Sequence, residues 1–264
     1  MRVSRSLKTY ILGSLFYGWD VPDRPRVFYY QTKSYLNRFL LKRKPSDRVV
    51  SVKAGKGTVH FRDNWFDPRN ICDVFKNDYN KIDADIFKGL KTFADIGSNI
   101  GLISACVRRE SPGCRIFCFE PLPDNANLCT MNAPGATVET VALGSKDGTA
   151  NLLVDRSGFM ASSIRFGYEQ KANEVKMFTL DGYFQGNPVG FDLIKIDVEG
   201  MEVEVILGGK RTVTGAKRVI AEVHSDELLS RFRDLMGSYG FRENSIERVE
   251  NNIYISDWLN TKRQ

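Results

Sequence analysis

Apolar and polar positions follow a regular order from residue 91 onward, where short apolar runs alternate with segments that have the spacing of amphipathic helices. The expected strands are 91–96, 114–120, 137–143, 191–198 and 218–224. The expected helices are 100–110, 123–132, 199–208 and 226–239. Strands that alternate with helices predict parallel βαβ units and an α/β fold with a mostly parallel, doubly wound sheet. The tail, which includes NNIYIS at 251–256, predicts one or two final strands, antiparallel at the edge of that sheet.

Two stretches depart from this order. Before it begins, aromatic-rich segments broken by Pro and Gly predict a helical and hairpin extension, in which His60 of GTVHFRD is a hairpin residue. The second stretch, 144–181, is an insertion with two strand-like pieces around RSGFMASSIRFGYE at 156–169, a loop that could cover an active site. We therefore expect a basic N-terminal extension or cap at 1–70 and a main domain at 71–264.

Composition narrows the class of protein. With 42% hydrophobic and 27% charged residues and no apolar run of about 18 residues, the chain is expected to be globular and not to span a membrane. Residues 10–19 are apolar, but no small-residue cleavage site follows, so we expect an amphipathic N-terminal helix or arm and not a secretory signal. Five cysteines without a CxxC pair argue against a disulfide framework and predict reduced thiols in the cytoplasm.

The net charge of +6 is unevenly distributed. The RFLLKRK segment at 38–44, together with Lys53, Lys56 and Arg62, makes the first quarter of the chain basic. Such a segment could bind an anionic surface, nucleic acid or acidic glycans, and peripheral attachment to a membrane is the alternative to a free cytoplasmic location. A solvated surface is the plainer explanation of the same charges.

A glycine turn in FADIGSNIGL, at 93–102, is the first candidate site. In an open α/β sheet, ligands bind at the carboxyl ends of the strands, which is where Asp95 is expected. A dinucleotide fingerprint needs G-x-G-x-x-G, but Asn99 stands at the middle glycine and Leu102 follows where further glycine would be needed. The Asp95 carboxylate would repel a pyrophosphate and favour a ligand that carries an ammonium and a sulfonium. S-adenosylmethionine has both of these charges and no phosphate.

A second acid supports a nucleoside site. Glu120 ends the apolar segment CRIFCFE, where the next strand would place its carboxylate against both ribose hydroxyls. NAD sites use an acid in the same role, so Glu120 alone does not distinguish the two cofactors. Asp95, the G-x-N-x-G turn and the Glu120-Pro121 pair together predict a sheet that binds a nucleoside.

Six motifs occur in one order along the chain: DIGSNIG, FEPLPDNANLCTMN, VALGSKDG, TLDGYF, IKIDVEGMEVEVILGG and AEVHS. With these motifs the chain resembles the FkbM family of S-adenosylmethionine-dependent methyltransferases from about residue 71 to 256. The resemblance implies a Rossmann-like class I methyltransferase fold with S-adenosyl-L-methionine as its cofactor. The cofactor-binding residues that it implies are Asp95, Gly97, Asn99 and Gly101 at the methionine end, Ser98 where the family often has alanine, Glu120 with Pro121 at the ribose, and Val141 with Ala142 at the adenine.

Methyl transfer is an in-line displacement at carbon, so the protein mainly holds the acceptor in line with the sulfonium, and a base helps when the acceptor is a hydroxyl. The candidates stand at two strand ends and are Lys195, Asp197 and Glu199 in LIKIDVEG and Glu222 and His224 in AEVHS. Period-two spacing places the members of each set on one face. If the two strands are neighbours, His224 would act as the base, and Asp197 or Glu199 would orient the acceptor or the imidazole.

Plainer interpretations stand beside these roles. DVEG could simply begin a helix with Asp197 or Glu199 near its positive end, and Lys195 could be the ion-pair partner of a buried acid. His224 could be structural. Carboxylates with a histidine could also bind a divalent metal, but no tight ligand spacing requires one, so no metal ligand is assigned from the sequence.

The leading hypothesis is O-methylation of a hydroxyl on a sugar, a glycolipid or a small metabolite, with the acceptor inferred from the resemblance alone. An RNA ribose 2′-O-methyltransferase is the alternative enzyme, motivated by the +6 charge. Against it, no aromatic platform for bases is evident. A non-catalytic binding or scaffold protein that keeps the fold is the third hypothesis, and the intact Asp95, Glu120 and Asp197 argue against it.

Overall fold

The computed structural model describes residues 24–37, 46–54, 57–64, 66–74, 84–154, 161–162, 171–250 and 252–263. These residues form two compact units, one within Met1–Lys88 and the other within Gly89–Gln264. The expected N-terminal arm at 10–19 and the basic segment at 38–44 lie outside the described residues, as does most of the 156–169 loop. None of the helices in the described ranges is long and apolar enough to cross a membrane.

The first unit combines helices with a hairpin. Its elements are α2 (Arg24–Tyr35), β1 (Val49–Ala54), β2 (Gly57–Arg62), α3 (Asp67–Asp73) and the short 3-10 helix η4 (Ala84–Phe87). Strands β1 and β2 pair antiparallel along their whole length, and His60 lies in β2. Tyr30 of α2 contacts Phe61 of β2 edge to face, with ring centroids 5.4 Å apart. The predicted helical and hairpin extension is thereby confirmed for the residues that are described.

Arg62 does not belong to the basic surface that was expected in the first quarter of the chain. Its side chain is almost completely buried, and its guanidinium binds the Asp67 carboxylate through two hydrogen bonds of 2.9 and 3.2 Å. A bidentate pair of this kind satisfies the charge inside the unit. Lys53 is exposed, whereas Lys56 lies outside the described residues. Arg62 is therefore a structural residue and not part of a surface that could attract anions.

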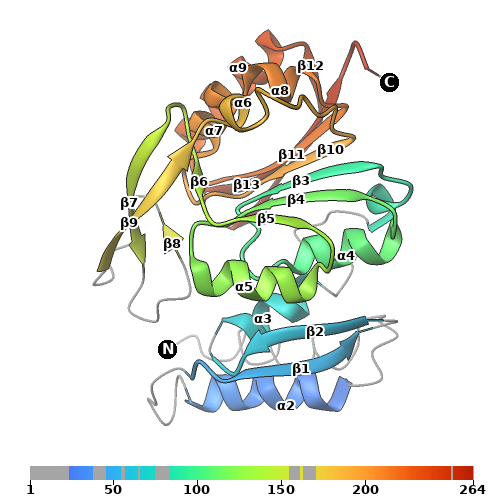
Figure 1. The fold of residues 1–264 in the computed structure, drawn as a ribbon, viewed down its shortest axis with the longest axis vertical. Coiled ribbons are helices and arrows are strands. Elements are labelled where there is room, and N and C mark those ends of the chain that lie inside the picture. Colours follow the sequence, from blue (N-terminus) through green and yellow to red (C-terminus); the bar gives the residue numbers. More distant parts are fainter. Residues whose placement is uncertain are drawn as a thin grey trace. The chain divides into compact units, whose positions relative to one another are not determined.

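The second unit is built on a seven-stranded sheet with the order β12-β13-β11-β10-β3-β4-β5 (Figure 1). The strands are β3 (Thr92–Ile96), β4 (Arg115–Phe119), β5 (Thr137–Glu139), β10 (Leu193–Ile196), β11 (Arg218–Val223), β12 (Phe241–Glu250) and β13 (Ile253–Asn260). Neighbouring strands from β11 to β5 are parallel, and β13 is antiparallel to both β11 and β12. The mostly parallel sheet is confirmed, and its antiparallel strand β13 lies next to the edge strand β12.

Helices cover both faces of this sheet (Figure 1). On one face lie α4 (Leu102–Glu110) and α5 (Pro123–Asn132), and on the other lie α6 (Leu180–Tyr183), α7 (Glu202–Gly208), α8 (Lys210–Thr214) and α9 (Asp226–Ser238). Local signals set several of the boundaries. Pro123 occupies the first turn of α5, where its missing N–H costs nothing, and the Ser225 side chain caps α9 by accepting from the Leu228 N–H. The Rossmann-like, doubly wound architecture is therefore present.

The insertion forms a second, smaller sheet with the order β6-β9-β7-β8. Its strands are β6 (Ala142–Leu143), β7 (Gly148–Val154), β8 (Ala161–Ser162) and β9 (Lys171–Phe178), and β7 pairs antiparallel with β9. The two strand-like pieces predicted in the insertion are thus confirmed. The single strand predicted at 137–143 is wrong, because β5 joins the large sheet while β6 pairs with β9 in the small one.

The centre of the large sheet is apolar with one exception. The flanking positions of β3 and β10, including Ala94, Ile96, Ile194 and Ile196, are at most 1% exposed, as expected for parallel strands covered on both faces. Asp95 and Lys195 stand directly opposite each other in the β3–β10 pairing, and both are buried. A buried charge needs a partner of opposite sign, and Asp95 and Lys195 are placed to be such partners.

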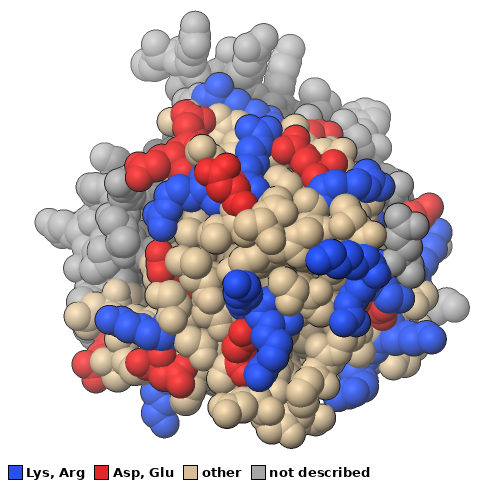
Figure 2. Space-filling model, turned by 90° about the horizontal axis from the view of Figure 1, so that it is seen from above, with Lys and Arg blue, Asp and Glu red and all other residues tan. Residues whose placement is uncertain are grey.

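The outer surface over helices α6 to α9 shows no separation of positive from negative side chains. Viewed from above in Figure 2, Lys and Arg side chains are interspersed with Asp and Glu side chains and with uncharged residues. Among the described residues, for example, Arg231 of α9 lies 3.7 Å from the Glu204 carboxylate of α7, and both side chains are partly exposed. Exposed pairs of this kind are screened by salt and contribute little to stability.

Candidate active site

The turn between β3 and α4 is held in place by backbone contacts. The N–H groups of Gly97 and Ser98 donate to the Phe119 carbonyl at 2.9 and 3.1 Å, so the turn is tied to the end of β4. Gly97 has a φ of 73°, and a Cβ there would lie 1.8 Å from the Asp197 carbonyl oxygen. Asn99 is also left-handed, at 50°. The sequence thus needs glycine at 97 because the β3 turn and the residue after β10 approach so closely.

Asp95 lies in β3, just before this turn, and is fully buried. One carboxylate oxygen accepts from the Ser104 hydroxyl at 2.7 Å, and the other is 3.1 Å from the Lys195 ammonium. Lys195 also donates to the Gly97 carbonyl at 2.8 Å. Burial lowers the pKa of Lys195, but the charges of Asp95 and Asp197 outweigh it and raise that pKa. The negative charge of Asp95 is therefore matched inside the protein.

Glu120 follows β4, and the residue is 5% exposed. It accepts from the Asn99 N–H at 2.9 Å, from the Leu122 N–H at 3.0 Å and from the Asn125 amide at 3.3 Å. Burial raises the pKa of Glu120, and these hydrogen bonds oppose the rise. Glu120 thus orders the glycine turn, and a carboxylate with about four acceptor positions still has capacity for a ligand hydroxyl.

The other predicted cofactor residues occupy different surroundings. Gly101 has a φ of 79° and precedes α4, and a Cβ there would lie 2.7 Å from the Cys129 sulfur. The Ser98 hydroxyl is buried and has no hydrogen-bond partner among the described residues. Val141 is buried, whereas Ala142 already belongs to β6 of the small sheet. Pro121 sits between Glu120 and α5.

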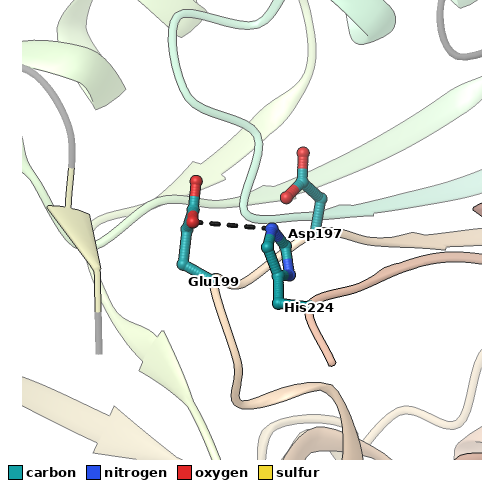
Figure 3. Close-up of side chains that lie close together, drawn as sticks. All are labelled: Asp197, Glu199 and His224. Atoms are coloured by element: carbon teal, nitrogen blue, oxygen red, sulfur yellow. Dashed lines mark ion pairs between the residues drawn. The ribbon is translucent and has the colours of Figure 1, made fainter. Parts of the chain in front are cut away.

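The second polar group stands at the ends of β10 and β11, which are adjacent and parallel. Asp197 follows β10, and its N–H donates to the Ile96 carbonyl at 3.0 Å. One ligand atom from each of Asp197, Glu199 and His224 can be chosen so that all three lie within 4.8 Å of one another. Figure 3 shows the two carboxylates on either side of the imidazole. We call Asp197, Glu199, Glu222 and His224 the strand-end cluster, and the predicted convergence of these residues is found.

His224 is held by a residue that the sequence analysis did not single out. Its Nδ1 lies 2.8 Å from a Glu202 carboxylate oxygen. Because an ionised carboxylate only accepts, Nδ1 carries the hydrogen and Nε2 faces the opposite way. On that side, Nε2 is 3.5 Å from Glu199 and 3.6 Å from Glu222.

Glu202 was missed because it was taken as an ordinary helical residue. A signal was present, since Glu202 shares a helix face with Val205 and Ile206, and a charge on an apolar face needs a buried partner. The helix expected from residue 199 begins only at Glu202. Glu199 therefore lies before the helix, in a left-handed conformation with a φ of 54° that is uncommon for a residue other than glycine.

Carboxylates crowd the imidazole, and the pKa values reflect this. Burial and the nearby Asp197 charge raise the pKa of Glu199 to about 7 and that of Glu222 to about 8. Burial lowers the pKa of His224, but the Glu202 hydrogen bond and the Asp197 charge raise it to about 10. In this arrangement the imidazole is protonated near neutral pH, and a protonated imidazole cannot accept a proton. The role of His224 as a base stays a prediction. It requires less negative charge around the imidazole, so that the pKa of His224 falls.

The part of the chain that contains both polar groups also matches a known protein family. The family described as the Methyltransferase FkbM domain matches residues 95–243, from the carboxylate of the glycine turn to β12. The chain belongs to the FkbM methyltransferase family. The match includes both the glycine turn and the strand-end cluster, so the two polar groups lie inside the methyltransferase domain.

Two curated relatives resemble part of this FkbM chain. The hexuronic acid methyltransferase AglP of Haloferax volcanii is 30% identical over 135 residues, which cover 50% of this chain and 55% of that protein. The 2-O-methyltransferase NoeI of Sinorhizobium fredii is 26% identical over 155 residues, 51% of this chain and 63% of that protein. The chain thus spans between half and two thirds of the length of these two relatives.

Solved structures show a weaker likeness. TrmK of M. capricolum, in complex with S-adenosyl-homocysteine, is 12% identical with a TM-score of 0.42, over 68% of this chain and 66% of that chain. Precorrin-6y C5,15-methyltransferase of Geobacter metallireducens is 15% identical with the same TM-score, over 64% and 80%. The family assignment therefore rests on the sequence match and not on these structures.

Proposed function

We propose that this chain is an S-adenosylmethionine-dependent O-methyltransferase whose acceptor is a hydroxyl of a sugar or a glycolipid. The observation that supports the proposal is the position of two polar groups at the carboxyl ends of adjacent strands. The glycine turn with Glu120 stands at β3 and β4, and the strand-end cluster stands at β10 and β11. Ligands of open α/β sheets bind at this edge. A cofactor at the first group would direct its methyl group toward an acceptor at the second.

The charges suit a sulfonium, although not in the way expected from the sequence. Asp95 is already matched by Lys195 at 3.1 Å. The acidic side chains outside this pair are those of the strand-end cluster, where Asp197 lies 3.7 Å from the same ammonium and is partly exposed. Positive charge at this end of the sheet would therefore be attracted by Asp197. The ribose hydroxyls would donate to Glu120.

The reaction transfers one methyl group. The acceptor oxygen attacks the methyl carbon, the carbon–sulfur bond breaks with its electron pair going to sulfur, and S-adenosylhomocysteine leaves. The acceptor proton passes to a group of the strand-end cluster. The principal contribution of this chain is then to hold the oxygen, the carbon and the sulfur in line, which can supply much of the rate enhancement.

The acceptor class is supported by the names of the relatives. The two names, a hexuronic acid methyltransferase and a 2-O-methyltransferase, support a sugar as the acceptor. The second name describes transfer to an oxygen at a numbered position, which supports a hydroxyl acceptor. We therefore propose that a methyl ether is formed and not a methyl ester.

Product analysis tests this proposal. The protein is incubated with methyl-labelled S-adenosylmethionine and with a neutral hexoside, a hexuronic acid glycoside or RNA, and the products are examined by mass spectrometry. We expect label in a sugar, and the label should survive alkaline hydrolysis because ethers resist it and esters do not. Asp197→Asn should abolish transfer, while the exposed Glu227→Gln should not. Label in an alkali-sensitive ester or only in RNA, or no release of S-adenosylhomocysteine, would contradict the proposal.

A further inference from the structure

The strand-end cluster contains the donor set of a metal site, although the sequence analysis assigned no metal ligand. Two carboxylates and one imidazole, from Asp197, Glu199 and His224, offer atoms within 4.8 Å of one another. Ligands on opposite sides of one ion, with bonds of about 2.1–2.4 Å, lie about 4.2–4.8 Å apart. The three donors could therefore reach one ion with at most small rotations of the side chains.

The geometry of His224 is an independent observation that points to a cation. Glu202, which is fully buried and is not one of the three donors, accepts from Nδ1 at 2.8 Å. Metal-binding histidines commonly donate their second nitrogen to a carboxylate, which sets the tautomer and leaves the first nitrogen for the metal. The Glu202 carboxylate also accepts from the Gly200 N–H at 2.8 Å, so its position is fixed by the backbone. Nε2 is thereby directed at Glu199 and Glu222.

The arrangement of acidic side chains around the imidazole leads to the same inference. Glu199, Glu202 and Glu222 each have an oxygen within 3.6 Å of an imidazole nitrogen of His224. Lys195, which lies beside the cluster, is nearer to Asp95 and to the Gly97 carbonyl than to Asp197. A divalent cation between Nε2 and the facing carboxylate oxygens would bind the imidazole and these acidic side chains together.

We propose that Asp197, Glu199 and His224 bind one divalent cation, with Glu222 beside it and Glu202 as the residue that positions the imidazole. Carboxylates favour Mg²⁺, Ca²⁺ and Mn²⁺, whereas imidazole favours the transition metals. The mixed set therefore suits Mn²⁺ better than Mg²⁺ or Ca²⁺. In a role that depends on the proposed function, the cation would hold the acceptor oxygen and make its proton easier to remove.

Mn²⁺ is the probe for a binding experiment that does not require activity. The full chain is treated with EDTA, desalted and titrated with Mn²⁺ while free Mn²⁺ is followed by electron paramagnetic resonance. We expect one saturable site whose spectrum shows coupling to a histidine nitrogen. His224→Ala should remove this coupling, and His224→Ala and Asp197→Asn should each weaken binding more than 10-fold.

Two glutamates on α7 provide a matched comparison. Glu202→Gln should weaken Mn²⁺ binding on the order of 10-fold, because positioning residues of metal sites usually contribute 10- to 100-fold. Glu204→Gln, two residues away, should leave binding unchanged, since this carboxylate is partly exposed and lies beside Arg231. Melting temperatures show whether each variant is folded. Absence of saturable binding in the folded wild type, or wild-type binding by folded His224→Ala, would overturn the site.

The same protein separates this inference from the proposed function. If EDTA stops methyl transfer and Mn²⁺ restores it, the catalytic role of the cation is supported. Methyl transfer that proceeds equally in EDTA overturns that role and leaves the proposed function intact. Saturable Mn²⁺ binding without transfer to any acceptor supports the site and counts against the function.

Discussion

Two regions lie at the carboxyl ends of the strands of the large sheet. Buried charges are matched by neighbouring groups in one region and crowded together in the other. Around the glycine turn, Asp95 is matched by Lys195, and Glu120 is held by two backbone N–H groups and an amide. In the strand-end cluster, several carboxylates surround one imidazole, and the pKa values of Glu199 and Glu222 rise to about 7 and 8. The difference teaches that the charges around the turn are matched by groups of the protein, whereas the cluster is suited to receive positive charge.

A substitution at Gly97, where the two regions touch, should have the largest effect on both of them. A Cβ in Gly97→Ala would lie 1.8 Å from the Asp197 carbonyl oxygen, and the left-handed φ of 73° is unfavourable for alanine. We expect a loss of stability of about 4 kcal/mol or more, with loss of cofactor binding. Thermal unfolding and calorimetry with S-adenosylhomocysteine measure the two effects.

A matched glycine provides the control for that variant. A Cβ at Gly113 would have nothing within 4 Å, so Gly113→Ala should stay close to the wild type. If Gly97→Ala melted like Gly113→Ala, the close approach of the turn to the residue after β10 would be refuted.

Removal of Lys195 should have the next largest effect, because this side chain contacts both regions. Lys195→Met leaves the fully buried Asp95 without its ion-pair partner, which we expect to cost about 3 kcal/mol of unfolding free energy. The additional change Asp95→Asn should restore part of the loss, since it removes the uncompensated charge. Urea denaturation of both variants gives the coupling, and a double variant less stable than Lys195→Met would contradict the pairing.

Glu120 tests whether the turn region is the cofactor site. Glu120→Ala should weaken S-adenosylhomocysteine binding by about 1.5–3 kcal/mol, because it removes charge-assisted hydrogen bonds to the ribose and the hydrogen bond that orders Asn99. Glu120→Gln, which keeps one acceptor oxygen, should lose less. Glu227→Ala, at an exposed position of α9, is the control for calorimetry. Unchanged affinity in Glu120→Ala would remove the ribose assignment.

The smallest effect is expected at the amino ends of the same strands, where another carboxylate is matched. Asp192 accepts from the N–H groups of Lys91 and Thr92 at 2.7 and 3.1 Å. Burial raises the pKa of Asp192, but these bonds and Lys217 outweigh it and lower that pKa. A lowered pKa stabilises the fold above the ordinary carboxyl pKa of about 4, and this stabilisation is lost as the pH falls further.

Asp192→Asn should therefore be about 1 kcal/mol less stable than the wild type at pH 7, and the difference should shrink below about pH 4. Melting temperatures between pH 3 and pH 7 measure this change. A difference that grew toward low pH would mean that Asp192 is not a matched carboxylate, and the contrast with Glu199 and Glu222 would fail.

Elements of the fold were predictable from the sequence where their signals lie among neighbouring residues. Helix α5 has the predicted bounds because Pro123 marks its start, and β3 and β4 were recognised because buried parallel strands are apolar throughout. A second strand in the tail was left open and its bounds were not predicted, since FRENSIERVE is mostly polar on both faces and becomes strand β12 by pairing with β13. The run at 137–143 carries no mark of the point where the chain passes from one sheet to the other.

In the candidate site, too, some features were predictable from motif spacing and others were not. Motif spacing was sufficient to bring Asp197, Glu199, Glu222 and His224 together, because neighbouring parallel strands end at one edge of the sheet. The interpretation of Lys195 as the ion-pair partner of a buried acid is confirmed, but spacing did not identify that acid as Asp95 or reveal that His224 is held by Glu202. Both pairs depend on the directions of side chains from separate elements.

By itself, the sequence determined the order of strands and helices, the FkbM family and the polar residues at the strand ends, because periodicity and motif spacing are properties of neighbouring residues. The tertiary structure alone decided which charges are matched. Asp95 and Lys195 are one hundred positions apart in the chain but directly opposite in the sheet. The strength of a charge interaction depends on distance in space and on burial, and both arise only when β3, β10 and β11 pack together.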